Sequence, residues 1–287
     1  MNIIEAQNLA CPIDGDALVS SSRQLTCKNG HTFDMARQGY VNLLPVQHKR
    51  SKQPGDSKAM VVARYRFLDS GIYQPIAERL CETVYTQICD KNEVCLLDAG
   101  CGEGYYFDFL YNSLAMKPGA TKLSFIGLDI SKEAIIQSTK RNKRISWIVG
   151  TNRQPPIRDE SVDIILCLFG FFSADGFNKI LKPGGRIILV DPGPEHLKEL
   201  REIIYPAIKK ADTVETSHAV NVHFRQIDSE KLQFKTKIPD NASINDLLIM
   251  TPHFYRASKE GRDAACELSA IEITVDVIFR ILEKNRP

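Results

Sequence analysis

A buried strand that runs directly into a glycine-rich turn is the feature that most constrains this fold. In "LLDAGCGEGYY" (96–106), an apolar run is followed by Gly100, Gly102 and Gly104. Glycine has no Cβ, so such a turn between a strand and a helix lets the backbone approach a bound ligand closely. The turn alone does not name the ligand, because dinucleotide sites use a similar one, although they usually read G-x-G-x-x-G.

An alternation of strands and helices begins at this turn. The apolar stretches that predict parallel strands are 94–100, 122–131, 146–151, 162–168 and 184–192. Between the second and the third, "KEAIIQSTKR" predicts a helix with Ser131 as its N-cap. Later segments at 231–239 and 271–279 alternate apolar with polar residues, which predicts an antiparallel pair. We therefore predict an α/β fold with a mixed seven-stranded sheet whose faces are covered.

Acidic residues accompany the glycines in an order that indicates a nucleoside cofactor. Asp98 precedes the turn, and Glu103 lies within it. Asp129 ends the next strand, where a carboxylate can accept hydrogen bonds from both ribose hydroxyls. The G-x-G-x-G spacing resembles motif I of class I (Rossmann-like) S-adenosylmethionine-dependent methyltransferases, and "VGTNRQPP" (149–156) and "LKPGGRIILV" (181–190) resemble later motifs. We therefore predict S-adenosylmethionine as the cofactor; a Rossmann-like domain for another nucleotide is the alternative.

The segment expected to hold adenine departs from the usual pattern. Thr151 stands where many methyltransferases of this class carry an acid that contacts the adenine amino group. Asn152 follows, and its backbone or its amide could make this contact instead. A solvated loop asparagine is the alternative.

The chain divides near residue 50. We predict a small N-terminal module over 1–50 and a methyltransferase domain over 51–287, with the polar stretch 46–57 as a linker or exposed loop. No apolar run reaches the roughly 18 residues that cross a bilayer. The N-terminus lacks a basic region followed by an apolar core, so we expect no secretory signal, no membrane contact and a cytoplasmic location.

Potential metal ligands occur in "CPIDGDALVSSSRQLTCKNGH" (11–31). Cys11 begins one half of a metal knuckle, and Cys27 and His31 form the other half. A zinc knuckle would place a second cysteine three residues after Cys11, but Asp14 stands there. Aspartate oxygen can bind zinc, although structural sites favour thiolates, and Asp16 is a possible substitute ligand. The alternative is a metal-free knuckle in which Asp14 caps a turn.

The flanks of the glycine turn carry a more specific resemblance. "HTFDMARQGYVNLLPVQHKRSKQPGDS" and "FLDSGIYQPI" closely resemble the large-subunit (23S) ribosomal RNA guanine-N1 methyltransferases, which have an N-terminal zinc knuckle and a class I domain. The resemblance implies methyl transfer from S-adenosylmethionine to N1 of a guanine in an RNA hairpin, and weakly a homodimer. It also implies a knuckle of three cysteines and one histidine, of which Cys11, Cys27 and His31 match three positions and Asp14 falls on the fourth.

The resemblance also implies roles for residues in the methyltransferase domain. Tyr73 in "SGIYQPI" and His196 in "PGPEHL" match cofactor contacts of the family. "LCLFGFFSAD" (166–175) follows the fourth predicted strand, the usual place for a target-base pocket. There, Phe169, Phe171 and Phe172 could stack on the base, or they could pack in the core. Asp175 and Asp191, near strand ends, are weak candidates for the base that removes the N1 proton.

The basic run 48–66, which includes Lys49, Arg50 and Lys52, is expected to contact RNA phosphates, with a solvated face as the alternative.

Two other functions remain open. A small-molecule methyltransferase, such as one acting on a quinone precursor, would explain the core but not residues 11–57. An RNA-binding protein without turnover would explain the flanks, but the cofactor glycines and Asp129 are all present.

We predict that replacing Lys49, Arg50 and Lys52 by glutamine weakens RNA binding without changing cofactor affinity. Each lost phosphate contact lowers the slope of log K against log salt by about 0.7, so the triple variant should lower it by about 2. Filter binding of 23S rRNA over a series of salt concentrations measures this slope. An unchanged slope would assign these three residues to a solvated face.

Overall fold

The computed structural model describes residues 4–48, 51, 53–117, 121–205, 222–251 and 257–285. Its strands are β1 (Val19–Ser21), β2 (Gln24–Thr26), β3 (Thr32–Asp34), β4 (Tyr40–Asn42), β5 (Glu93–Ala99), β6 (Lys122–Asp129), β7 (Ser146–Val149), β8 (Val162–Leu168), β9 (Leu181–Pro192), β10 (Phe224–Ile238) and β11 (Ile271–Lys284). Its helices are η1 (Ala6–Asn8), η2 (Val46–His48), α1 (Lys58–Asp69), α2 (Gln74–Ile88), α3 (Tyr105–Ala115), α4 (Lys132–Arg141), α5 (Ala174–Ile180), α6 (Lys198–Ile204), α8 (Asn241–Met250) and α10 (Lys259–Cys266).

The main sheet has eight strands in the order β10-β11-β9-β8-β5-β6-β7-β4. The pairs from β9 through to β4 are parallel, and β11 pairs antiparallel with both β9 and β10. The predicted α/β class, parallel core and antiparallel closing pair are confirmed. The predicted count of seven strands was wrong, because β4 adds an eighth at the edge beside β7. Three residues without clear alternation gave this strand no signal in the sequence.

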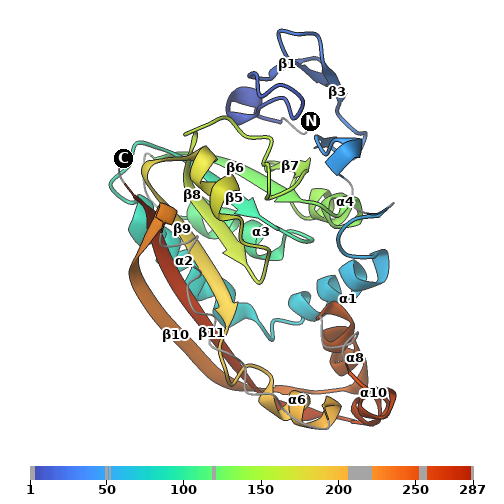
Figure 1. The fold of residues 1–287 in the computed structure, drawn as a ribbon. Coiled ribbons are helices and arrows are strands. Elements are labelled where there is room, and N and C mark those ends of the chain that lie inside the picture. The colour runs from blue at the N-terminus through green and yellow to red at the C-terminus, as the bar shows by residue number, and fades with distance from the viewer. Residues whose placement is uncertain are drawn as a thin grey trace.

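The N-terminal segment joins the main sheet and its core. Strands β1, β2 and β3 form a separate antiparallel sheet at one end of the molecule, opposite α6, α8 and α10 (Figure 1). Leu9 and Leu25 from this segment lie in one hydrophobic cluster with Leu97, Ile126 and Ile148 of the main sheet. The two parts of the predicted division at residue 50 therefore share a sheet and a core, and the division itself stays a prediction.

Local sequence signals explain where the helices start. The Ser57 side chain accepts a hydrogen bond from the Met60 N–H at the start of α1, and Ser131 accepts one from Ala134 N–H at the start of α4, as predicted. Helix α1 packs against α8, where Arg66 binds the Asp246 carboxylate, with Nε 2.7 Å from Oδ2. This pairing joins two helices that are far apart in the sequence.

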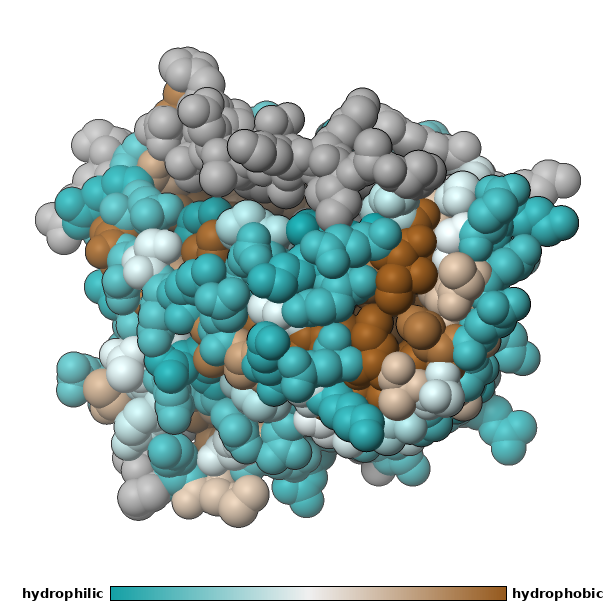
Figure 2. Space-filling view, turned by 90° about the horizontal axis from the view of Figure 1, so that it is seen from below, coloured by the Kyte–Doolittle hydropathy of each residue, from teal (hydrophilic) through white to brown (hydrophobic). Residues whose placement is uncertain are grey.

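The surface seen in Figure 2 is largely hydrophilic, with one hydrophobic area toward the right of the view. Within the described ranges, no helix combines the length and the apolar character that crossing a membrane requires.

Candidate functional site

A cavity of about 390 Å³ opens at the carboxyl ends of β5, β6 and β8. In open parallel sheets this edge is where ligands bind. Its lining comes from the glycine turn, the ends of the three strands, the loop after β7, and the segment around α1. The lining residues are Gly55, Asp56, Arg64, Leu68, Asp98, Gly100, Cys101, Gly102, Glu103, Tyr105, Tyr106, Asp129, Ile130, Gly150, Thr151, Asn152, Arg153, Leu168, Phe169, Gly170 and Phe171.

The glycine turn has the conformation that its sequence predicted. Gly100, Gly102 and Gly104 have φ values of 92°, 56° and 88°, in the left-handed region that favours glycine. A Cβ on Gly104 would also lie 2.8 Å from Ser138 Cβ and 2.9 Å from Trp147 Cη2. The turn can therefore bring α3 against α4 and β7 only if glycine occupies position 104.

Two buried carboxylates face the cavity from neighbouring strands. Asp129 accepts the Gly102 N–H through Oδ2 at 2.9 Å and the Ser131 N–H through Oδ1 at 2.7 Å. Burial raises the pKa of Asp129, although these two hydrogen bonds oppose the rise. Burial, with the negative charge of Asp129 nearby, raises the pKa of Asp98 to about 8. A cationic ligand beside these carboxylates would favour their ionised forms.

Glu103 lines the cavity, but its carboxylate is paired. The buried Glu103 side chain binds Arg141 of α4, whose guanidinium also contacts Asp69 at 2.8 Å and lies over the Tyr65 ring. Burial raises the pKa of Glu103, and Arg141 opposes that rise. The pair fixes the start of α3 against α4.

Tyr73 and His196 form one buried pair beside Phe169. The backbone N–H of Asp276 donates to His196 Nδ1 at 3.2 Å, so a neutral imidazole carries its proton on Nε2. That Nε2 atom lies 3.3 Å from the Tyr73 hydroxyl oxygen. The Phe169 ring stacks on the imidazole at a centroid distance of 6.2 Å. Tyr73 and His196, each implied by the resemblance as a cofactor contact, are therefore in contact with each other but are not part of the cavity lining. His196 reaches the cavity only through its contact with Phe169, which lines it.

The three aromatic residues after β8 point in different directions. Phe169 and Phe171 line the cavity and are 40% and 53% exposed. Phe172 instead packs against Phe177 and Phe224, as the core interpretation of these residues expected. Phe169 has a φ of 52°, which a residue with a Cβ rarely adopts, so the surrounding contacts must hold it there.

The two candidates for the proton-abstracting base lie outside the cavity lining. The Asp175 side chain is exposed and binds His223 Nε2 at 2.9 Å. Asp191 pairs with Arg280 at 2.8 Å, and burial raises the pKa of Asp191 while Arg280 lowers it. Lys49, Arg50 and Lys52 lie outside the described residues.

Several cavity residues were missed by the sequence analysis. Arg64, which the sequence analysis counted in the basic run, points into the cavity and pairs with Asp56. The loop carrying Asp56 reaches the site because Gly55 packs against Ser131, where a Cβ would lie 2.8 Å from the serine Cβ. Tyr106 and Arg153 also line the cavity. Both lie within quoted motif segments, 96–106 and 149–156, and this position was the available signal.

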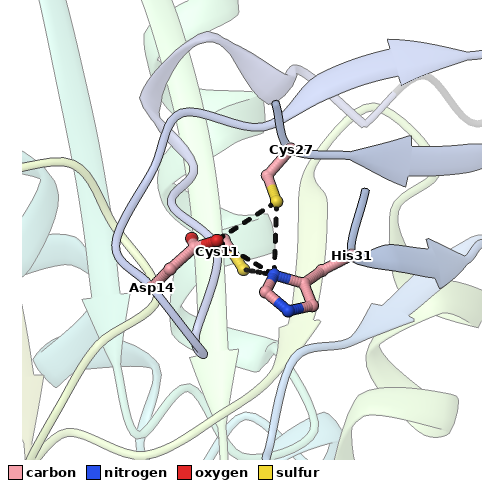
Figure 3. Close-up of side chains that lie close together, drawn as sticks. All are labelled: Cys11, Asp14, Cys27 and His31. Atoms are coloured by element: carbon pink, nitrogen blue, oxygen red, sulfur yellow. Dashed lines mark hydrogen bonds and ion pairs between the residues drawn. The ribbon is translucent and has the colours of Figure 1, made fainter. Parts of the chain in front are cut away.

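Four potential metal ligands lie close together beside the connection between β2 and β3: Cys11, Asp14, Cys27 and His31 (Figure 3). One ligand atom from each lies within 4.8 Å of the others. His31 Nδ1 lies 3.6 Å from Cys11 Sγ, 3.4 Å from Cys27 Sγ and 2.9 Å from Asp14 Oδ2. Donors at about 2.0–2.3 Å from a tetrahedral zinc ion lie about 3.3–3.8 Å from each other. The two distances to sulfur lie within this range, and the 2.9 Å contact between His31 and Asp14 is shorter than it. The four residues therefore suit zinc once the histidine and the aspartate move slightly apart, with Asp14 in the place of a cysteine.

The surroundings of Asp14 favour this role over Asp16. Asn29 donates to Asp14 Oδ2 at 2.9 Å, and this bond is the main cause of the lowered pKa of Asp14. The Asp16 carboxylate instead contacts Lys28 at 2.8 Å and Asn29 at 2.7 Å. Asn29 thus orients the ligand from outside the cluster, as is common around metal sites.

Comparison with known proteins covers both parts of the chain. Residues 9–52 match the zinc-ribbon family model described as "RlmA, N-terminal", and residues 96–185 match the one described as "Methyltransferase domain". The "23S rRNA (guanine(748)-N(1))-methyltransferase" of Streptomyces fradiae is 32% identical over 95% of each chain. YxjB of Bacillus subtilis (strain 168), named provisionally as a 23S rRNA guanine-N1 methyltransferase, is 30% identical over 93% of this chain and 94% of its own.

A relative that acts on a different substrate matches only part of the chain. The "Malonyl-[acyl-carrier protein] O-methyltransferase" of Xylella fastidiosa (strain M23) is 32% identical over 48% of this chain and 47% of its own. About half of each chain therefore lies outside this alignment.

We predict that Asp129→Ala weakens S-adenosylmethionine binding by at least about tenfold, since losing one charge-assisted hydrogen bond costs about 1.5–3 kcal/mol. Isothermal calorimetry measures the affinity. Asp228→Ala, on the outer strand β10, is the matched control. Thermal melting of both variants shows whether they fold, because Asp129 also accepts two backbone N–H groups. An affinity within about twofold of the parent would remove Asp129 from the cofactor site.

We predict that Asp14→Cys tightens zinc binding and raises the thermal midpoint, because structural zinc sites favour thiolate. Metal analysis after mild dialysis, together with melting curves with and without a chelator, measures both effects. Asp16→Asn is the control, since it leaves the four ligands unchanged. If the parent holds less than about a tenth of an equivalent of zinc and its melting ignores the chelator, the knuckle folds without metal.

Proposed function

Since this chain belongs to the family of 23S rRNA guanine-N1 methyltransferases, we propose that it transfers a methyl group from S-adenosylmethionine to N1 of a guanine in large-subunit ribosomal RNA. The observation that carries the proposal is the extent of the similarity. It spans the N-terminal metal cluster as well as the methyltransferase domain, and both parts are present in the structure.

The cavity supplies groups suited to the cofactor. The carboxylate of Asp129 would hold the ribose, and the turn at Gly100 and Gly102 would allow the methionine part to lie against backbone. Asn152 donates its amide to the Phe171 carbonyl at 3.0 Å, so its side-chain oxygen or its backbone would contact adenine. Tyr73 and His196 would support the site through Phe169, whose ring stacks on the His196 imidazole. S-Adenosylmethionine supplies an electrophilic methyl group on a sulfonium.

The target guanine places its own demands on the site. Its N1 lies on the Watson–Crick edge, so a paired guanine must be unpaired or flipped out before it can enter the cavity. In this transfer the N1–carbon bond would form as the carbon–sulfur bond breaks, the electron pair would stay on sulfur, and N1 would lose its proton to a base. Phe169, exposed at the end of β8, would hold the base in line with the methyl group, and such positioning contributes much of the acceleration.

The base that accepts the N1 proton is not assigned by these contacts. Asp175 and Asp191 would each have to leave a present partner, His223 or Arg280, before serving in that role. Their candidacy therefore rests on the sequence alone.

The N-terminal module would grip the RNA. Four protein ligands leave zinc no open position for a substrate, so its role here would be structural. A metal that holds this region would present the neighbouring basic stretch, including Lys49, Arg50 and Lys52, to the phosphates.

We place the protein in the cytoplasm with its ribosomal RNA. The expected homodimer is a further proposal, which light scattering of the purified chain would test.

We predict that the purified protein forms 1-methylguanosine in an unmodified 23S rRNA transcript, and that Asp129→Ala loses this activity. Nucleoside mass analysis after digestion detects the product, and primer extension maps its position. In a strain lacking the gene, one methylguanine should disappear from the RNA. Transfer to small acceptors without transfer to RNA would favour the small-molecule alternative. RNA binding without any transfer would favour the non-catalytic one.

A further inference from the structure

An exposed aromatic ring and a guanidinium stack at the mouth of the cofactor cavity. The Arg153 guanidinium carbon lies 4.5 Å from the centre of the Phe171 ring, and both residues line the cavity. Phe171 is 53% exposed, and Arg153 is exposed as well. Among the residues that the structure describes, no ion pair includes Arg153, which is exposed. The pair therefore presents an exposed aromatic ring, with the guanidinium over one of its faces, and a positive charge without an ion-pair partner among the described residues.

Hydrogen bonds to the backbone hold the two loops that carry this pair. The side-chain amide of Asn152 donates to the Phe171 carbonyl at 3.0 Å, which joins the loop after β7 to the loop after β8. The Arg153 N–H donates to Thr151 Oγ1 at 3.3 Å. Gly176 of α5 backs the loop so closely that a Cβ there would lie 2.3 Å from the Asn152 carbonyl oxygen. A surface prepared in this way loses little freedom when a ligand stacks on it.

The two exposed phenylalanines have separate surroundings. Phe169 contacts Tyr106 of α3 and His196, which precedes α6. Phe171 contacts Arg153, on the side of the loop after β7. The two rings therefore offer two different surroundings in the cavity, one of aromatic groups and one with a cation.

We propose that Phe171 and Arg153 form a second subsite, which takes the nucleotide next to the target guanine. The flanking base would stack on Phe171, and Arg153 would contact its phosphate. This inference rests on the proposed function. Base stacking on aromatic side chains combined with a positive groove is the general chemistry of single-stranded RNA binding. Binding of this flanking nucleotide by Phe171 and Arg153 would keep the target guanine out of its helix, while Phe169 holds the guanine itself.

The test uses Phe171→Leu and Arg153→Gln, with Phe171→Tyr and Arg153→Lys as conservative partners. Phe171→Leu should weaken binding of an unmodified 23S rRNA transcript by about fivefold or more, while S-adenosylmethionine affinity stays within about twofold of the parent. Arg153→Gln should lower the slope of log K against log salt by about 0.7, whereas Phe171→Leu should leave the slope unchanged. Phe171→Tyr should retain RNA affinity, and Arg153→Lys should retain the salt slope.

Arg225→Gln, which removes an exposed arginine from β10, is the matched control and should leave transcript affinity unchanged. A parallel fall in cofactor affinity for Phe171→Leu would overturn the inference and place the ring over adenine. Unchanged RNA affinity in both variants would also overturn it. In either case the proposed function stands if the parent still forms 1-methylguanosine, and it fails separately if the parent forms none.

Discussion

The carboxylate of Asp129 is the point on which the geometry of the cavity depends. Its two oxygens accept backbone N–H groups from Gly102 and from Ser131, so one side chain fixes the glycine turn relative to the start of α4. Ser131 then donates its hydroxyl to the Asp56 carbonyl at 2.8 Å, which attaches the segment before α1. Three segments distant in sequence thus meet at one strand end, and each of them lines the cavity.

The N-terminal region packs against the sheet that carries the cavity. Strand β4 continues the parallel sheet beside β7, and Leu9 and Leu25 pack into the cluster that holds Leu97 of β5. A metal that orders Cys11, Asp14, Cys27 and His31 would therefore stabilise residues in contact with the cofactor-binding sheet. Because metal binding to such a cluster contributes directly to folding, loss of the metal would affect both the N-terminal region and the sheet against which it packs.

Charge inside the cavity is mostly compensated by partners from other elements. Glu103 is neutralised by Arg141, and Asp56 by Arg64, whereas Asp98 has a raised pKa because it is buried close to Asp129. Among the described residues that line the cavity, uncompensated charge lies in two places. Negative charge lies deep in the cavity, where a sulfonium would be favoured, and the positive charge of Arg153 lies at its mouth, where RNA phosphate would arrive.

The sequence by itself determined the parts that depend on local spacing. Alternation of apolar segments gave the order and type of the main strands, the glycine spacing gave the cofactor turn, and the spacing from Cys11 to His31 gave the metal cluster, including Asp14. Only the tertiary structure decided what depends on distant pairing: that β4 joins the sheet, that Arg64 turns into the cavity, and that Phe171 rather than Phe172 faces its mouth. Periodicity reports which faces of a segment are apolar, but not which other segment will cover them. The neighbours of Phe172, including Phe224 some fifty residues away, are brought together only by the folded sheet.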